Sequence, residues 1–221
     1  MKRGNIIMLH TIELKEIFKE IDKSIVLNHI SCEFHSGEIY GIVGRNGSGK
    51  TMLFRLICGL IYPTSGKILV DGQEVRSCTE KLTIGLMLEN IGLYQDLTIL
   101  ENLICFAKIN KKVGKEEIYE AIRAVGLEPK DKRKIKKYSL GMRQKAVIAQ
   151  AIMEKPDILI LDEPSNALDS QGVEMLREII KMEAKRGTIV VLASHNKEDI
   201  QILRKRIYEM EQGNLKEIIL K

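Results

Sequence analysis

The sequence predicts an α/β fold with a parallel-sheet core, an antiparallel β-subdomain and a helical insert. Continuous apolar segments at 158–161 and 188–193 enclose an amphipathic helical pattern, which is typical of parallel strands buried on both faces. A glycine-rich loop at 44–51 stands between a strand pattern and a helix pattern, an arrangement that α/β proteins use to hold phosphate. We expect a single domain over the whole chain (1–221), divided as follows: core, 1–89 and 156–221; helical insert, about 90–155.

Strand patterns dominate the first part of the chain. Alternating or β-branched residues predict strands at 8–18, 24–34, 38–43 and 82–88. Residues 67–75 predict a hairpin that turns at Asp71-Gly72, a pair suited to the left-handed backbone of tight turns. A short helix is expected at 52–57, directly after the glycine-rich loop.

Helical patterns follow. Thr98 and Glu101 form a capping box that begins a helix, and a second helix is expected at 115–125. Ser139 is expected to cap a third helix. An amphipathic helix is predicted at 170–185, and the chain is expected to end in a hairpin that turns at Gln212-Gly213-Asn214.

The glycine-rich loop is the strongest functional signal in the sequence. It fits the spacing of a phosphate-binding loop, or P-loop, and comprises Gly44, Arg45, Asn46, Gly47, Ser48, Gly49, Lys50 and Thr51. Glycines let the backbone wrap a phosphate closely, and the N–H groups at the following helix start attract its charge. Lys50 would contact the β- and γ-phosphates, and the Thr51 hydroxyl would bind Mg²⁺. The alternative is a glycine-rich turn that binds nothing, and the flanking strand and helix argue against it.

Two carboxylates end the apolar strand at 158–161. In phosphate-loop proteins, an aspartate in the position of Asp162 holds Mg²⁺ through water. The adjacent Glu163 would orient or deprotonate the attacking water. An acidic turn after a core strand is the simpler interpretation of this pair alone, and the phosphate-binding loop favours the catalytic one.

Further motifs resemble those of the nucleotide-binding subunits of ATP-binding cassette (ABC) transporters, and the resemblance covers nearly the whole chain. Residues 139–144 look like the family signature, and 165–169 look like its D-loop. Ala193-Ser194-His195 looks like the strand end that carries the switch histidine. Five motifs in the family's order make a specific signal, although each is short.

The resemblance implies a P-loop NTPase that binds and hydrolyses ATP with Mg²⁺. Two subunits, as a homodimer or a heterodimer, would sandwich two ATP molecules head to tail. Ser139 and Gly141 would contact the ATP bound by the other subunit, and His195 would contact the γ-phosphate. A separate integral membrane permease would be the partner, which would hold the chain on the inner face of the cell membrane, and no nucleic acid partner is expected.

Several positions depart from the usual family pattern. Glu89 stands at the Q-loop position, where glutamine is usual, and would still bind Mg²⁺. Together with Ser-Leu-Gly-Met in the signature, this resembles the ATPases of bacitracin-resistance and lantibiotic-immunity exporters. Leu140 requires a negative φ, and Met52 replaces a hydroxyl residue that contacts the α-phosphate. Phe18 is the best match for the aromatic residue that stacks on adenine.

Charge and composition leave other functions open. The net charge of +5 is compatible with nucleic acid or an anionic membrane surface, although it often has no specific meaning. The lysine-rich segment 130–137 is most simply a solvated face, and a contact with lipid headgroups or a partner is the alternative. No apolar run reaches the roughly 18 residues that span a bilayer. The apolar stretch after the basic start, at 6–9, is too short for a signal peptide. We therefore expect a cytosolic chain that a partner holds at the membrane.

Two rival functions share the phosphate-binding loop. A non-transport ABC-type ATPase, acting in DNA repair or translation, would usually carry long coiled coils or two cassettes, and the sequence has neither. A P-loop kinase would need no signature helix. We therefore expect an exporter ATPase whose transported substrate is a peptide antibiotic or a similar compound.

Overall fold

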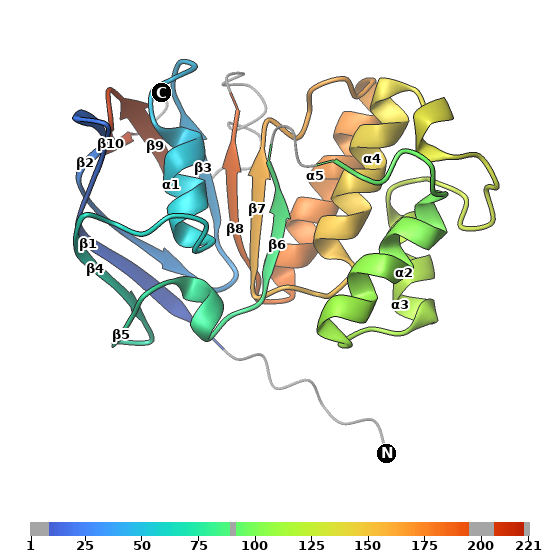
Figure 1. Ribbon diagram of the computed structural model, residues 1–221, viewed down its shortest axis with the longest axis horizontal. Coiled ribbons are helices and arrows are strands. Elements are labelled where there is room, and N and C mark those ends of the chain that lie inside the picture. The colour runs from blue at the N-terminus through green and yellow to red at the C-terminus, as the bar shows by residue number, and fades with distance from the viewer. Residues whose placement is uncertain (1–8, 89–91, 195–205, 219–221) are drawn as a thin grey trace.

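The computed structural model describes residues 9–88, 92–194 and 206–218, and two sheets organise it (Figure 1). The four-stranded antiparallel sheet has the order β2-β1-β4-β5, and the six-stranded sheet has the order β10-β9-β3-β8-β7-β6. The strands are β1 (Thr11–Ile21), β2 (Ser24–His35), β3 (Ile39–Val43), β4 (Ser65–Val70), β5 (Gln73–Val75), β6 (Ile84–Met87), β7 (Ile158–Asp162), β8 (Ile189–Ala193), β9 (Arg206–Glu211) and β10 (Asn214–Ile218).

The six-stranded sheet is parallel except at its β9–β10 edge. Its central strands are buried on both faces because successive side chains point into different cores. Leu159 and Leu161 of β7 pack toward the helices at 99–152 and 170–185, whereas Ile158 and Ile160 pack toward helix α1 (Lys50–Ile57) and the antiparallel sheet. Apolar runs without polar alternation are therefore required here, and the predicted α/β fold class is confirmed.

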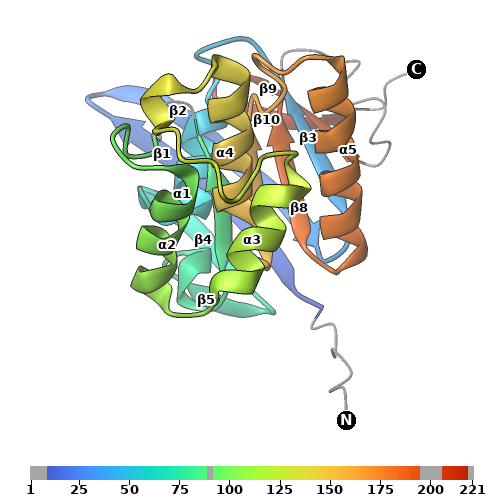
Figure 2. The same ribbon diagram turned by 90° about the vertical axis from the view of Figure 1, so that its right-hand side faces the viewer.

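Helices cover both faces of this sheet (Figures 1 and 2). Helix α1 lies between the two sheets, α4 and α5 cover the opposite face, and α2 and α3 pack outside α4. Thr98 and Glu101 form the predicted capping box, and the Ser139 hydroxyl accepts a hydrogen bond from the Met142 N–H at 3.2 Å, which begins α4. The α-helices are α1 (Lys50–Ile57), α2 (Ile99–Asn110), α3 (Lys115–Ala124), α4 (Leu140–Ile152) and α5 (Ser170–Lys185).

Helix α4 packs on the sheet through Gly85 of β6. A methyl group at Gly85 would lie 2.1 Å from the Ala151 carbonyl oxygen. We expect Gly85→Ala to lower the free energy of unfolding by about 1–3 kcal/mol, because α4 must shift to admit it. Urea denaturation measures the loss. Gly92→Ala is the control, since a Cβ there meets nothing within 4 Å, and equal midpoints for the two variants would contradict the prediction.

Candidate functional site

The phosphate-binding loop joins the end of β3 to the start of α1. Gly49 has φ 115°, and a Cβ there would lie 2.9 Å from the Val26 carbonyl oxygen, so only glycine fits. Helix α1 begins at Lys50 with no side-chain cap and no acidic residue in its first turn. Its first N–H groups therefore remain available to an anion, which the helix dipole also attracts.

The loop holds two buried polar groups, the Lys50 ammonium and the Ser48 hydroxyl. Lys50 is 6% exposed, and its ammonium donates to the carbonyl oxygens of Gly44 at 2.7 Å and Arg45 at 3.1 Å. The Ser48 hydroxyl is buried and makes no hydrogen bond within residues 9–88, 92–194 and 206–218. A phosphate oxygen would accept from the Lys50 ammonium, so the loop fits a nucleotide phosphate.

A hydroxyl and a carboxylate meet beside the loop. The Thr51 hydroxyl donates to Asp162 Oδ2 at 2.8 Å, although the two residues are far apart in sequence. Asp162 is the last residue of β7 and is 5% exposed. Hard oxygen ligands of this kind are those that Mg²⁺ prefers, so the pair fits that ion.

The next residue, Glu163, has an unusual backbone. Its φ is 51°, in the left-handed region that costs a non-glycine residue on the order of 1 kcal/mol. Hydrogen bonds hold this conformation: the Glu163 N–H donates to Ala193 O at 2.9 Å, and the Glu163 carbonyl accepts from the Asn166 N–H at 3.2 Å. The amide of Gln144 on α4 also donates to the Glu163 carbonyl, at 3.3 Å. The backbone direction of Glu163 is thus fixed from three segments.

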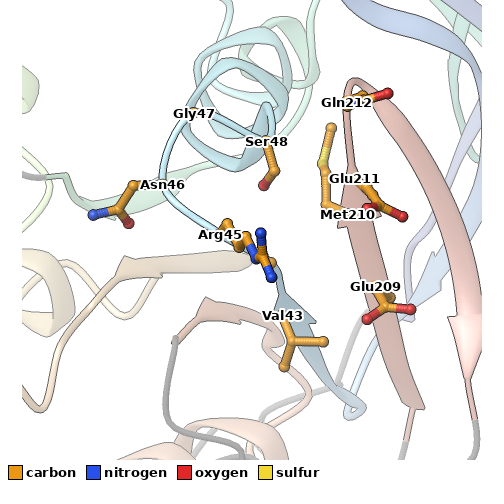
Figure 3. A pocket seen from close by; sticks show the side chains of 10 residues that line it. Val43, Arg45, Asn46, Gly47, Ser48, Glu209, Met210, Glu211 and Gln212 are labelled. Carbon is orange, nitrogen blue, oxygen red and sulfur yellow. The ribbon is translucent and has the colours of Figure 1, made fainter.

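Two cavities flank the phosphate-binding loop. The first, of about 570 Å³, brings together predicted site residues from the loop, α1 and the end of β7: Asn46, Gly47, Gly49, Lys50, Thr51, Met52, Asp162 and Glu163. The second, of about 620 Å³, lies between the loop and β9 and has Gly44, Arg45 and Ser48 on its loop side (Figure 3). Gln212, in the β9–β10 turn, borders both cavities.

Phe18 does not line either cavity. Its ring packs on His29, with centroids 5.3 Å apart, and its backbone pairs with Ser65 of β4. The apolar residues that border the cavity of about 570 Å³ are Ile25 and Val26 of β2 and Met52 of α1. Ile25 and Val26 are not evident as site residues from the sequence, because aliphatic residues in a strand carry no binding signal of their own.

Ser139 and Gly141 lie at the start of α4 and line neither cavity. A Cβ at Gly141 would lie 2.8 Å from the Ala167 carbonyl oxygen, so the signature segment packs directly on 165–169 of the same chain. Leu140 is helical and 64% exposed, and it is not among the described residues with positive φ, as the sequence analysis required. Glu89 and His195 lie outside the described residues.

The chain just before Ser139 is held by a polar cluster. Burial raises the pKa of Tyr138 to about 12, and the Asp131 carboxylate adds to the rise. The Arg133 guanidinium, 2.7 Å from Asp131, holds the pKa of that carboxyl below its usual value. At neutral pH the Tyr138 hydroxyl therefore donates to an ionised Asp131, at 3.2 Å, and this bond fixes the start of the signature segment.

The fold and the site define a phosphate-loop protein built to bind a nucleoside triphosphate. The sequence model described as ABC transporter matches residues 27–166. The chain is 44% identical to the uncharacterized ABC transporter ATP-binding protein YybJ of Bacillus subtilis, over 92% of this chain and 94% of the relative. The chain belongs to the ABC transporter family, and it is an ATP-binding subunit of the type that hydrolyses ATP.

Other relatives have named transport roles. The bacitracin transport ATP-binding protein BcrA of Enterococcus faecalis is 37% identical, over 96% of this chain and 70% of its own length. The lantibiotic transport ATP-binding protein SrtF of Streptococcus pyogenes is 32% identical, over 92% of this chain and 88% of its own. The fold matches the dimeric structure of MJ0796, a bacterial ABC transporter cassette, with a TM-score of 0.84 at 26% identity, covering 95% of this chain and 99% of that one.

These comparisons confirm the resemblance to ABC transporter ATPases and to the subfamily that contains bacitracin and lantibiotic transporters. In this family the ATPase domains work as dimers with membrane permeases. Within the described parts of this chain, no helix combines the length and apolar character needed to cross a membrane.

Proposed function

We propose that this chain hydrolyses MgATP to power a separate membrane permease that exports a peptide antibiotic or a similar compound. One observation carries the ATPase part of the proposal. Lys50, Thr51, Asp162 and Glu163 surround one cavity, although they come from two distant segments. Their chemistry supplies a phosphate cradle, a cation site and a general base in a single place.

The residues have distinct roles in this proposal. The loop N–H groups and Ser48 bind the phosphates, and the Lys50 ammonium moves from the Gly44 and Arg45 carbonyls to the β- and γ-phosphates. Thr51 and Asp162 hold Mg²⁺, which would neutralise charge on the phosphates. Glu163 orients a water toward the γ-phosphate and accepts its proton, which yields ADP and inorganic phosphate.

The second half of the ATP site comes from another subunit in this proposal. Ser139 and Gly141 line neither cavity, so the ATP bound by their own loop lies out of their reach. They would face the ATP of a partner ATPase subunit, either a second copy or a related chain. His195 would contact the γ-phosphate, and Glu89, at the Q-loop position, would be a Mg²⁺ ligand, as the sequence predicts.

The transport role rests on the relatives named for bacitracin and lantibiotic transport. A permease partner would place the chain at the inner face of the cell membrane, where it has access to cytoplasmic ATP. Nucleic acid has no part in this function. A non-transport ABC-type ATPase remains the rival, and it would need no permease.

Co-expression with the membrane subunit that copurifies with the chain tests the transport role. We expect the pair, but not the chain alone, to raise the bacitracin or lantibiotic concentration that a sensitive host survives. A pair in which the chain carries Glu163→Gln is the matched control and should give no protection. ATPase activity that nucleic acid stimulates, without any permease dependence, would instead support the rival function.

A further inference from the structure

The turn of the C-terminal hairpin contacts the phosphate-binding loop through its backbone. The Gly213 N–H donates to the Ser48 carbonyl at 2.9 Å, and the Gly213 carbonyl accepts from the Asn28 N–H at 2.8 Å. A side-chain bond, from Asn28 Nδ2 to Asn214 Oδ1 at 3.0 Å, runs parallel to the second of these. The turn therefore joins the phosphate-binding loop to β2, the strand whose Ile25 and Val26 border the cavity.

The packing at this junction leaves no space for a side chain on either partner. Gly213 is buried, has φ 80°, and a Cβ there would lie 3.1 Å from the Val26 carbonyl oxygen. On the loop, a Cβ at Gly44 would lie 2.3 Å from the Met210 carbonyl oxygen, and one at Gly49 would lie 2.7 Å from Met210 Cε. Figure 3 shows the Met210 side chain extending between Ser48 and the end of β9.

The phosphate-binding loop is therefore held in place by β9 and the β9–β10 turn as well as by its own residues. Ser48 is a residue of the phosphate-binding loop, it is buried, and its carbonyl is held by the turn. A displacement of the turn is transmitted to Ser48 by a backbone hydrogen bond, and phosphate cradles depend on positions held to within about 0.5 Å.

We propose that Gly213 is a positioning residue for ATP binding, because the β9–β10 turn fixes the phosphate-binding loop against β2. The inference rests on the ATP site proposed above. It assigns a role in nucleotide affinity to a turn that lies far from the loop in sequence.

The chain contains a matched control turn. The β4–β5 turn has the same backbone, with φ 53° at Asp71 and 74° at Gly72, against 46° at Gln212 and 80° at Gly213. A Cβ at Gly72, however, meets nothing within 4 Å. Alanine at either glycine therefore carries similar backbone strain, and only the Gly213 variant pushes on the site.

The experiment compares Gly72→Ala and Gly213→Ala by calorimetric ATP titration and steady-state ATPase kinetics, well below both melting temperatures. We expect Gly213→Ala to weaken ATP affinity about tenfold relative to Gly72→Ala and to raise KM more than it lowers kcat. Equal affinities in the two variants would overturn the proposal.

A second pair covers the case in which Gly213→Ala does not fold. Asn214→Ala removes the side-chain bond to Asn28 and two bonds within the turn, from Asn214 Nδ2 to the Glu211 and Gln212 carbonyls, without backbone strain. Asn110→Ala removes a side-chain bond to Glu154, at 2.8 Å, remote from the site. We expect Asn214→Ala alone to weaken ATP affinity, by about two- to fivefold. Equal affinities in this pair would also overturn the proposal. Whether the unmutated chain binds ATP tests the proposed ATP site. The role of the β9–β10 turn is tested separately, by the difference in ATP affinity between the two variants of each pair.

Discussion

Glu163→Gln is expected to lower ATP turnover by about 10²–10⁴-fold, the usual contribution of a positioned general base. Glutamine has nearly the same shape but cannot accept a proton from water. The backbone at this position is held by Ala193, Asn166 and Gln144, so the amide should occupy the place of the carboxylate. ATP affinity should change little, and the ATP-bound dimer should accumulate on gel filtration because hydrolysis no longer separates it.

The control for this variant is Glu174→Gln. Glu174 lies on α5 and forms an exposed ion pair with Arg177 at 3.2 Å, so the same chemical change there should leave turnover unaltered. Measurements of kcat with saturating MgATP compare the two variants. Normal turnover in Glu163→Gln would remove Glu163 from the catalytic role.

Lys50→Ala is expected to weaken ATP affinity by about 10- to 150-fold. The estimate follows from the loss of one hydrogen bond to a charged group, which is worth about 1.5–3 kcal/mol. The ammonium is buried within the loop and donates to the Gly44 and Arg45 carbonyls, so it is already placed where a phosphate would bind. Calorimetric titration with ATP measures the change.

Lys67→Ala serves as the control for charge alone. Lys67 lies on β4 and pairs with Glu74 at 2.8 Å, and both side chains are exposed. Its removal changes the net charge by the same amount without touching the loop. If both variants keep the ATP affinity of the unmutated chain, the cradle role of Lys50 is refuted.

Local sequence patterns predicted the helices and strands well because each depends on neighbours in the chain. The Thr98–Glu101 capping box and the Asp71-Gly72 turn both lie where the residue types require them. The β1–β2 turn was missed. Asp22 and Lys23 both have positive φ without a glycine, and the long pairing of β1 with β2 holds them there.

The position of the Phe18 ring depends on irregular strand pairing. The pairing of β1 with β2 is irregular between Leu14 and Glu20, and Glu16 and His29 have positive φ within their strands. Bulges of this kind re-aim side chains, so a regular two-residue period does not predict which way a ring points. In the structure Phe18 packs on His29, and its stacking on adenine stays a prediction.

Short-range spacing in the sequence specifies the local chemistry: a glycine loop at a helix start, a carboxylate pair after a buried strand, and a serine that caps the signature helix. Each depends on spacing within a few residues. Tertiary packing sets which of these groups meet, since strand order and register bring Thr51 to Asp162, Gln144 to Glu163 and Gly213 to Ser48. Contacts between distant segments depend on how whole elements pack, and no local pattern encodes that packing.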